Sequence, residues 1–285
     1  MWTPRPYTSK ATHPDPVVSI DELRLDAEAR RGGHGSTWSR LWPGLLSLGA
    51  LLGGWQLLTA SGAVAPLILP PPVEVARAGS EFAGPITEAA LVTLAEVLLG
   101  FAAAVAAGFA VALPISYSRR LRAAIYPPLL LLNALPKAAL APIFLIWFGF
   151  GLTHKVVVAF LVAFFPIVVA LNAGLKRVDP ELHDLSRSLH ASWLQTFLKI
   201  DLPFALPSLF SGMRVAITLA VVGAVIAEFV AGDGGIAHLL RSAGAQHQTA
   251  LSFACAATLS FLSAALFGLV VLAEYLAVPW ARRNS

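Results

Sequence analysis

Long apolar segments alternate along the chain with short polar connections. A helix needs about 20 predominantly apolar residues to cross the hydrocarbon core of a bilayer. Segments that meet this requirement are residues 41–60, 89–115, 123–150, 156–175, 208–231 and 251–278. The pattern predicts an all-α integral membrane protein with about six transmembrane helices.

The composition agrees with a membrane protein and disfavours a soluble one. Of the 285 residues, 57% are hydrophobic and 13% are charged, against about 25% charged in an ordinary soluble domain. The net charge of +4 comes from clusters between the apolar segments, so it indicates topology rather than nucleic-acid binding. The single cysteine, Cys255, excludes an intrachain disulfide and a CxxC site.

The basic residues of the connections predict the orientation of the chain. Six spans put both termini on one side of the membrane. If that side is the cytoplasm, the opposite face keeps only Arg77, Lys155 and Arg241, which satisfies the positive-inside rule. The predicted parts are a cytoplasmic tail (1–40), a first transmembrane helix (41–60), a periplasmic connection (61–88), a core (89–278) with one long cytoplasmic loop (176–207), and a cytoplasmic C-terminal tail (279–285).

The loop 176–207 is too polar to enter lipid, yet it has a helical pattern. Asp179 suits an N-cap and Pro180 suits the first helical position. Apolar residues follow at steps of three or four, which predicts one apolar stripe: Leu182, Leu185, Leu189, Trp193, Phe197 and Ile200. Leu202-Pro203 and Pro207 are expected to end the helix. The stripe fits either a helix on the membrane surface or a helix that docks on a partner.

Specific residues in this loop favour docking. DLSRSLHAS (184–192), FLKIDLP (197–203), ALP (205–207) and GMR (212–214) resemble the "EAA" loop of permeases in binding-protein-dependent ATP-binding-cassette importers. In that family the loop forms a coupling helix that docks on the ATPase subunit. The resemblance assigns ATPase coupling to Asp184, Leu185, Ser186, Leu189, His190, Ser192, Phe197, Leu202 and Pro203. His190 departs from the family pattern, which has a glycine at this turn.

The resemblance extends over residues 69–274. PPPV (70–73), LPKAALAP (135–142), WFG (147–149), FFP (164–166) and GGI (234–236) are similar to the subgroup that imports nitrate, taurine, sulfonates, thiamine precursors and riboflavin. It implies a type I permease fold in the bacterial inner membrane and a small, anionic or heterocyclic solute. The implied partners are a second copy of the permease, two ATPase subunits that hold ATP and Mg, a periplasmic solute-binding protein and membrane lipid.

Ionisable side chains inside the predicted spans are candidates for the translocation path, because such residues are costly in lipid and usually face a bundle interior or a water-filled path. The candidates are Lys137, Glu228, Asn133 and Glu96. Lys137 either lines the path, where it would suit an anionic solute, or is a structural partner of Glu96 or Glu228. Glu228 fits a gate, a tie between helices or a solute contact.

The sequence offers no chemistry of its own. It has no G-x-x-x-x-G-K-[ST] loop for nucleotide phosphates, no H-E-x-x-H, no G-x-S-x-G, and no histidines at metal-ligand spacing. We therefore expect no catalytic residue, no metal site and no cofactor on this chain. The alternative is an ion-coupled secondary transporter or channel, in which Glu96, Lys137 and Glu228 would be the coupling charges. A loop ending in Leu-Pro argues against it, since such a carrier needs no docking helix.

Overall fold

The computed structural model describes residues 37–280 and divides the chain into two units, Met1–Leu57 and Leu58–Ser285. The predicted tails, 1–40 and 279–285, lie outside the described residues except for 37–40 and 279–280. The first unit contains most of α2 (Thr37–Ala60), a 24-residue helix that includes the predicted first span.

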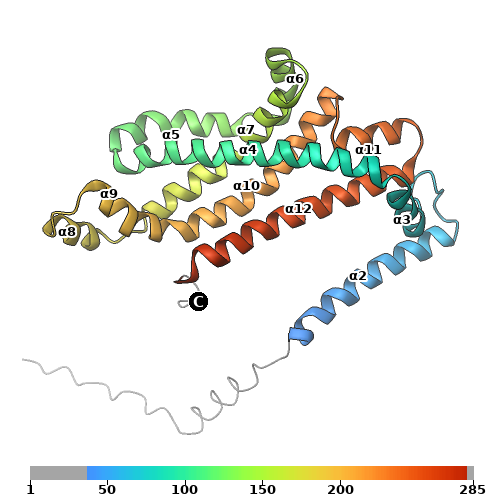
Figure 1. The fold of residues 1–285 in the computed structure, drawn as a ribbon, viewed down its shortest axis with the longest axis horizontal. Coiled ribbons are helices and arrows are strands. Elements are labelled where there is room, and N and C mark those ends of the chain that lie inside the picture. The colour runs from blue at the N-terminus through green and yellow to red at the C-terminus, as the bar shows by residue number, and fades with distance from the viewer. Residues whose placement is uncertain (1–36, 281–285) are drawn as a thin grey trace, which may run out of the picture. The chain divides into compact units, whose positions relative to one another are not determined.

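The described part of the second unit is helical and contains no strand (Figure 1), which confirms the all-α prediction. Its elements are α3 (Pro72–Glu81), α4 (Ala83–Tyr117), α5 (Arg119–Ala134), α6 (Lys137–Phe148), α7 (Leu152–Leu175), α8 (Pro180–Ser188), α9 (Trp193–Thr196), a π-helical turn η1 (Phe197–Asp201), α10 (Leu202–Ala231), α11 (Ile236–Ala245) and α12 (Thr249–Ala277).

Among the described residues, four helical segments are long and apolar enough to cross a membrane: Ala83–Tyr117, Leu152–Leu175, Trp193–Ala231 and Thr249–Ala277. The bent pair α5 and α6 makes a fifth if it counts as one span. The predicted segment 41–60 is helical within α2. The count of six stays a prediction.

Helix α7 forms the centre of the second unit and packs along α4 and α10. Small residues allow this close approach, as is usual between transmembrane helices. A Cβ atom at Gly212 of α10 would lie 2.3 Å from the Cβ of Ala170, and one at Gly223 would lie 2.7 Å from the Cα of Ala159. Glycine at these two positions brings the backbones of α7 and α10 together.

The predicted third span, 123–150, is broken rather than continuous. Helices α5 and α6 meet at an angle of 95°. The break lies at Leu135-Pro136, because a residue before proline avoids the helical region and Leu135 is extended (φ −64°, ψ 138°). In the single chain this broken span is largely exposed, and its only buried residues are Leu129 and Ala141.

Candidate functional site

A buried ion-pair cluster joins α4, α7 and the turn that follows α10. The ammonium of Lys155 lies 3.0 Å from Oε1 of Glu96 and 2.8 Å from Oδ1 of Asp233. It also lies 3.3 Å from the carbonyl oxygen of Gly234, to which it donates a hydrogen bond. Lys155 is 2% exposed and Glu96 is fully buried. From its sequence context Lys155 was expected on the outer surface, and the sequence did not predict this cluster.

Asp233 anchors the cluster from the turn. Besides Lys155, its carboxylate accepts a hydrogen bond from the backbone N–H of Gly151 at 2.7 Å. Burial acts to raise the pKa of Asp233, but the ammonium of Lys155 and the Gly151 N–H outweigh it and hold the pKa below its ordinary value. The Asp233–Lys155 contact is therefore a pair of full charges at neutral pH.

Glu228 ties α10 to α4 and to the start of α11. Its Oε1 accepts a hydrogen bond from the Thr93 hydroxyl at 2.6 Å, and its Oε2 accepts one from the N–H of Ala237 at 2.6 Å. The Thr93 hydroxyl in turn accepts from the N–H of Ile236 at 2.9 Å. Gly235 (φ 92°) makes this possible, because a Cβ atom there would lie 2.1 Å from the Glu228 carboxyl carbon. Of the roles considered for Glu228, its hydrogen bonds fit a structural link between helices.

Lys137 lies apart from these acids, at the bend between α5 and α6. Its ammonium donates a hydrogen bond to Oδ1 of Asn133 at 2.8 Å and lies 6.0 Å from the centre of the Phe165 ring. Both polar side chains line a cavity of about 180 Å³ whose other walls are Leu129, Leu132, Phe160, Leu161, Phe164 and Phe165. Of the two alternatives for Lys137, pairing with Glu96 or Glu228 is wrong, since those acids have the partners named above. That Lys137 and Asn133 line the path stays a prediction.

The loop 176–207 contains two short helices rather than one. As predicted, Asp179 caps α8 by accepting from the N–H of Glu181 at 3.0 Å. Helix α8 ends at Ser188, and His190 takes the left-handed conformation (φ 54°) that the family's glycine would take. Ser192 then begins α9, in a reciprocal capping box with Gln195. The single apolar stripe is therefore wrong, because the turn at His190 divides it.

The turn leaves part of the stripe uncovered. Leu185 is 56% exposed and Leu189 is 72% exposed, whereas Phe197 and Ser186 are buried. Asp184 is exposed and pairs with Arg187 at 3.1 Å. The expectation that Leu202-Pro203 and Pro207 end the loop helix is also wrong. These residues lie inside α10, which continues from α9 and η1 as part of the segment Trp193–Ala231.

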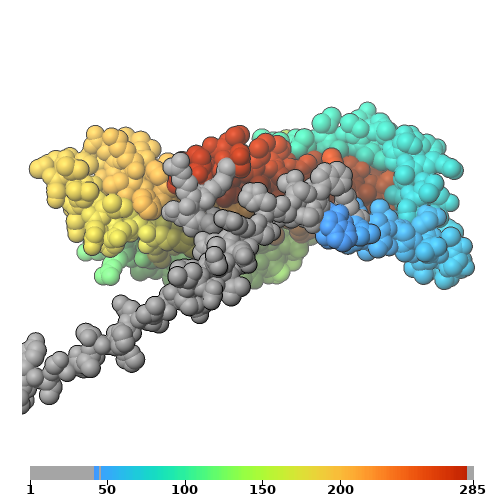
Figure 2. Space-filling model, turned by 90° about the horizontal axis from the view of Figure 1, so that it is seen from below, coloured from blue at the N-terminus to red at the C-terminus, as the bar shows by residue number. Residues whose placement is uncertain are grey.

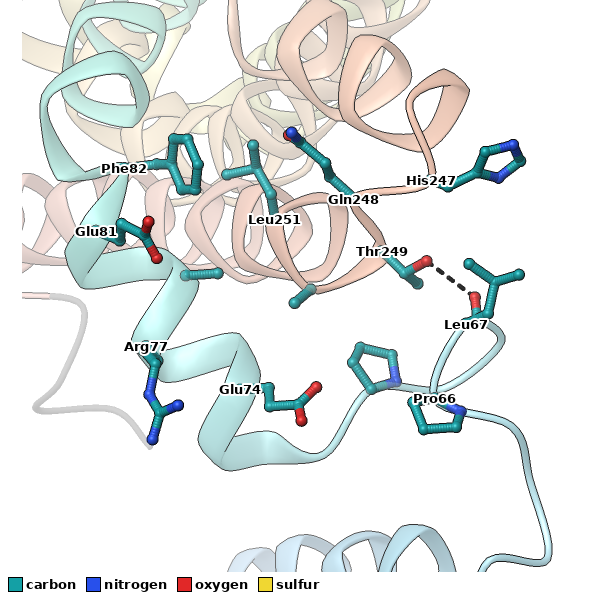
Figure 3. A pocket seen from close by; sticks show the side chains of 13 residues that line it. Pro66, Leu67, Glu74, Arg77, Glu81, Phe82, His247, Gln248, Thr249 and Leu251 are labelled. Carbon is teal, nitrogen blue, oxygen red and sulfur yellow. Dashed lines mark hydrogen bonds between the residues drawn. The ribbon is translucent and has the colours of Figure 1, made fainter.

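A pocket of about 430 Å³ lies near α3 (Figure 3). Its walls come from residues 66–70, from α3 and from the turn before α12. The Thr249 hydroxyl donates a hydrogen bond to the carbonyl oxygen of Leu67 at 2.9 Å and holds two of these segments together. Side chains at the pocket are apolar (Pro66, Leu67, Phe82, Leu251) and charged (Glu74, Arg77, Glu81). The pocket was not predictable from the sequence, because its walls are far apart in the chain.

Within the second unit, helices α8 and α9 lie at the opposite end from α3 and the pocket. Figures 1 and 2 show the yellow and orange segment of the loop at one end, and the teal start of α4 at the other. The helices α4, α7 and α10 connect the two ends. A loop and a pocket at opposite ends suit a protein that has one partner on each side of a membrane.

Comparisons with known proteins agree on one family. Residues 99–280 match the model of the family described as "Binding-protein-dependent transport system inner membrane component". The chain is 36% identical to the riboflavin transport system permease protein of Chloroflexus aurantiacus over 84% of this chain and 91% of that protein. It is 31% identical to the taurine transport system permease protein of Escherichia coli K12 over 82% and 88%. An inward-facing structure of the MetNI methionine transporter has a TM-score of 0.58 at 19% identity, covering 68% of this chain and 95% of that chain.

Proposed function

The chain belongs to the family of inner membrane components of binding-protein-dependent transport systems, and we propose that it imports a small anionic or heterocyclic solute with energy from a separate ATPase. As a family member it is an ABC transporter permease, a transport subunit of the inner membrane. Riboflavin, a flat heterocycle, and taurine, a sulfonate, are the solutes in the names of two relatives. Lys137 and Asn133 place an ammonium and an amide at the wall of an otherwise apolar cavity, which favours a solute of this kind.

The observation that carries the proposal is the exposed apolar face of loop 176–207. Leu185 and Leu189 are exposed at α8 and the turn after it, and Trp193 and Leu194 are exposed on the neighbouring α9. Leaving apolar surface in water costs about 25 cal/mol per Å². Binding of a partner that covers these side chains would therefore be favourable. We infer that this face docks on the ATPase subunit. The residues Asp184, Ser186, His190 and Ser192 shape the face, and Phe197, Leu202 and Pro203 join it to α10.

The assembly that follows contains two copies of this chain, two ATPase subunits and a solute-binding protein at the opposite end. ATP and Mg bind on the ATPase subunits. When ATP closes the ATPase pair, the docked loops move together and the membrane helices open the path toward the binding protein. Both termini of the chain then lie in the cytoplasm, on the same side as loop 176–207.

An uptake assay separates this function from an ion-coupled carrier. The complex purified with its ATPase is reconstituted in vesicles together with its binding protein, and radiolabelled taurine and riboflavin serve as probes. We expect uptake of at least one probe that requires ATP and stops when the catalytic Glu or Lys of the ATPase is replaced. Uptake driven by a sodium or proton gradient without ATP would contradict the proposal.

The same vesicles test Lys137. Lys137→Met keeps the length of the side chain and removes its charge, so taurine uptake should fall about tenfold, as expected for one lost charge-assisted contact. Because Lys137 has a neutral partner, the complex should assemble in normal amounts. Lys176→Met, at an exposed lysine outside the cavity, is the matched control and should leave uptake unchanged. Normal taurine uptake by Lys137→Met would show that Lys137 does not contact the solute in the path.

A further inference from the structure

A buried carboxylate lies where loop 176–207 meets the membrane helices. Asp201 is the last residue of η1, directly before α10, and it is 2% exposed. A carboxylate buried at this depth is costly unless polar partners satisfy it. Its partners come from two other elements, one before and one after the central helix α7.

The first partner is His183 of α8. Its Nε2 lies 3.0 Å from Oδ1 of Asp201. The second partner is Tyr117, the last residue of α4, whose hydroxyl donates a hydrogen bond to Oδ2 of Asp201. One carboxylate therefore links α8 to the C-terminal end of α4 and to the start of α10.

Aromatic contacts support the same junction from the second loop helix. Trp193 of α9 meets the Tyr117 ring edge-on, with 6.0 Å between ring centres, and stacks on Phe197 at 5.8 Å. Tyr117 thus contacts α9 through its ring and Asp201 through its hydroxyl. Substitution by phenylalanine would separate these two roles.

The π-helical turn explains how Asp201 reaches the interior. The N–H of Leu202 bonds the carbonyl of Phe197, five residues earlier. This wider turn leaves both Phe197 and Asp201 buried. π-Helical turns are rare and occur frequently at functional sites. In a straight α-helix the side chains after this turn would be rotated, and the position of Asp201 between His183 and Tyr117 would change.

We propose that Asp201, His183 and Tyr117 are positioning residues that transmit movement of α8 to α4 and α10. The inference rests on the proposed docking of α8 on the ATPase. Helix α8 makes few packing contacts with the other described elements. Its movement is therefore coupled to the membrane helices mainly through side-chain hydrogen bonds and ion pairs. The other tie is a 3.4 Å contact between the hydroxyls of Ser186 and Thr196, which stays within the loop. Asp201 is the tie that reaches α4.

Removing the contacts of Asp201 with His183 and Tyr117 should impair the coupling between ATP hydrolysis and transport. Removing them leaves Leu185 and Leu189 in place, so the ATPase should still bind and hydrolyse ATP. Movement of α8 would no longer be passed on in full to α4 and α10. The amount of solute transported per ATP hydrolysed should then fall, because the two processes become uncoupled.

The test measures ATP hydrolysis and taurine or riboflavin uptake in the same vesicles, with the complete complex. We expect Tyr117→Phe and Asp201→Asn to retain the ATPase in normal amounts and to lower the solute-to-ATP ratio about tenfold, the scale of a lost hydrogen bond to a charged group. His183→Gln changes a partly exposed side chain and provides a third variant if the buried changes impair folding. Tyr126→Phe, the same change on α5, is the matched control and should leave the ratio unchanged.

Two results would overturn the inference. If Tyr117→Phe and His183→Gln leave the solute-to-ATP ratio at the wild-type value, the tie does not transmit movement. If hydrolysis and uptake fall in equal proportion, so that the ratio is again unchanged, the three residues only stabilise the fold. Absence of the ATPase from the wild-type complex is a separate outcome that would contradict the proposed function itself and remove the basis of this inference.

Discussion

Replacing Lys155 with methionine should destabilise the protein by about 3–5 kcal/mol, the usual cost of removing one partner of a buried ion pair. The change leaves Glu96 fully buried without its cation, and Asp233 loses the contact that joins the turn to α7. At a rough 2–4 °C per kcal/mol, the apparent midpoint of thermal unfolding should fall by about 10 °C. The single cysteine, Cys255, is buried, so its labelling by a thiol-reactive dye in the purified chain reports the unfolding.

A matched variant separates the ion pair from the loss of any lysine. Lys137→Met makes the same change at a side chain whose hydrogen-bond partner is the neutral Asn133, and we expect a shift of only a few degrees. Adding Glu96→Gln to Lys155→Met removes the unpaired carboxylate and should restore part of the loss. Equal midpoints for Lys155→Met and the wild-type chain would show that the cluster contributes little to stability.

Replacing Leu185 or Leu189 with aspartate should release the ATPase from the complex. Both side chains are exposed on the free chain, and a side chain in the buried centre of an interface is worth about 2 kcal/mol or more. The introduced carboxylate adds a desolvation cost, so the affinity should fall at least about 30-fold. The measurement is the amount of ATPase that co-purifies with an affinity tag on this chain, together with stimulated ATP hydrolysis.

Two controls make this result specific to docking. Leu185→Met keeps an apolar side chain of similar volume and should retain the ATPase, since such exchanges usually cost less than about 1.5 kcal/mol. The amount of each variant in the membrane fraction should stay normal, because α8 lies outside the membrane-spanning helices. Unchanged ATPase recovery with both aspartate variants would place the docking surface elsewhere.

The apolar pattern of the sequence predicted most of the helices but not their interruptions. The segments 89–115, 156–175 and 208–231 lie within long helices, and so does 251–278 except for its last residue. Apolar length alone determines which segments can enter lipid. The break at Leu135-Pro136 was not expected at that place, since the same span contains three other prolines that leave α5 and α6 intact. Pro127, Pro128 and Pro142 lie inside these helices, whereas Pro136 is the N-cap of α6.

The candidate site was predicted only where local sequence determines it. The N-cap at Asp179 depends on neighbouring residues, and the structure has it. The turn at His190 interrupts the apolar pattern, so the pattern alone did not predict it. The Glu96–Lys155–Asp233 cluster depends on residues from three separate elements. Lys155 lies in the short connection between the predicted spans 123–150 and 156–175, so its sequence context was typical of a surface residue. The available signal was Glu96, an acid inside a predicted span that needs a cation, but the sequence offered Lys137 as well as Lys155 for that role.

The composition of the intact complex tests the account most directly. Native mass spectrometry of the complex extracted from its own bacterial membrane measures the number of each subunit without any assumption about the solute. We expect two copies of this chain with two copies of a separate ATPase subunit, and loss of the ATPase from the complex in Leu189→Asp. The account would be contradicted by a wild-type chain that is extracted as a monomer or homo-oligomer without an ATPase subunit and still transports solute in vesicles.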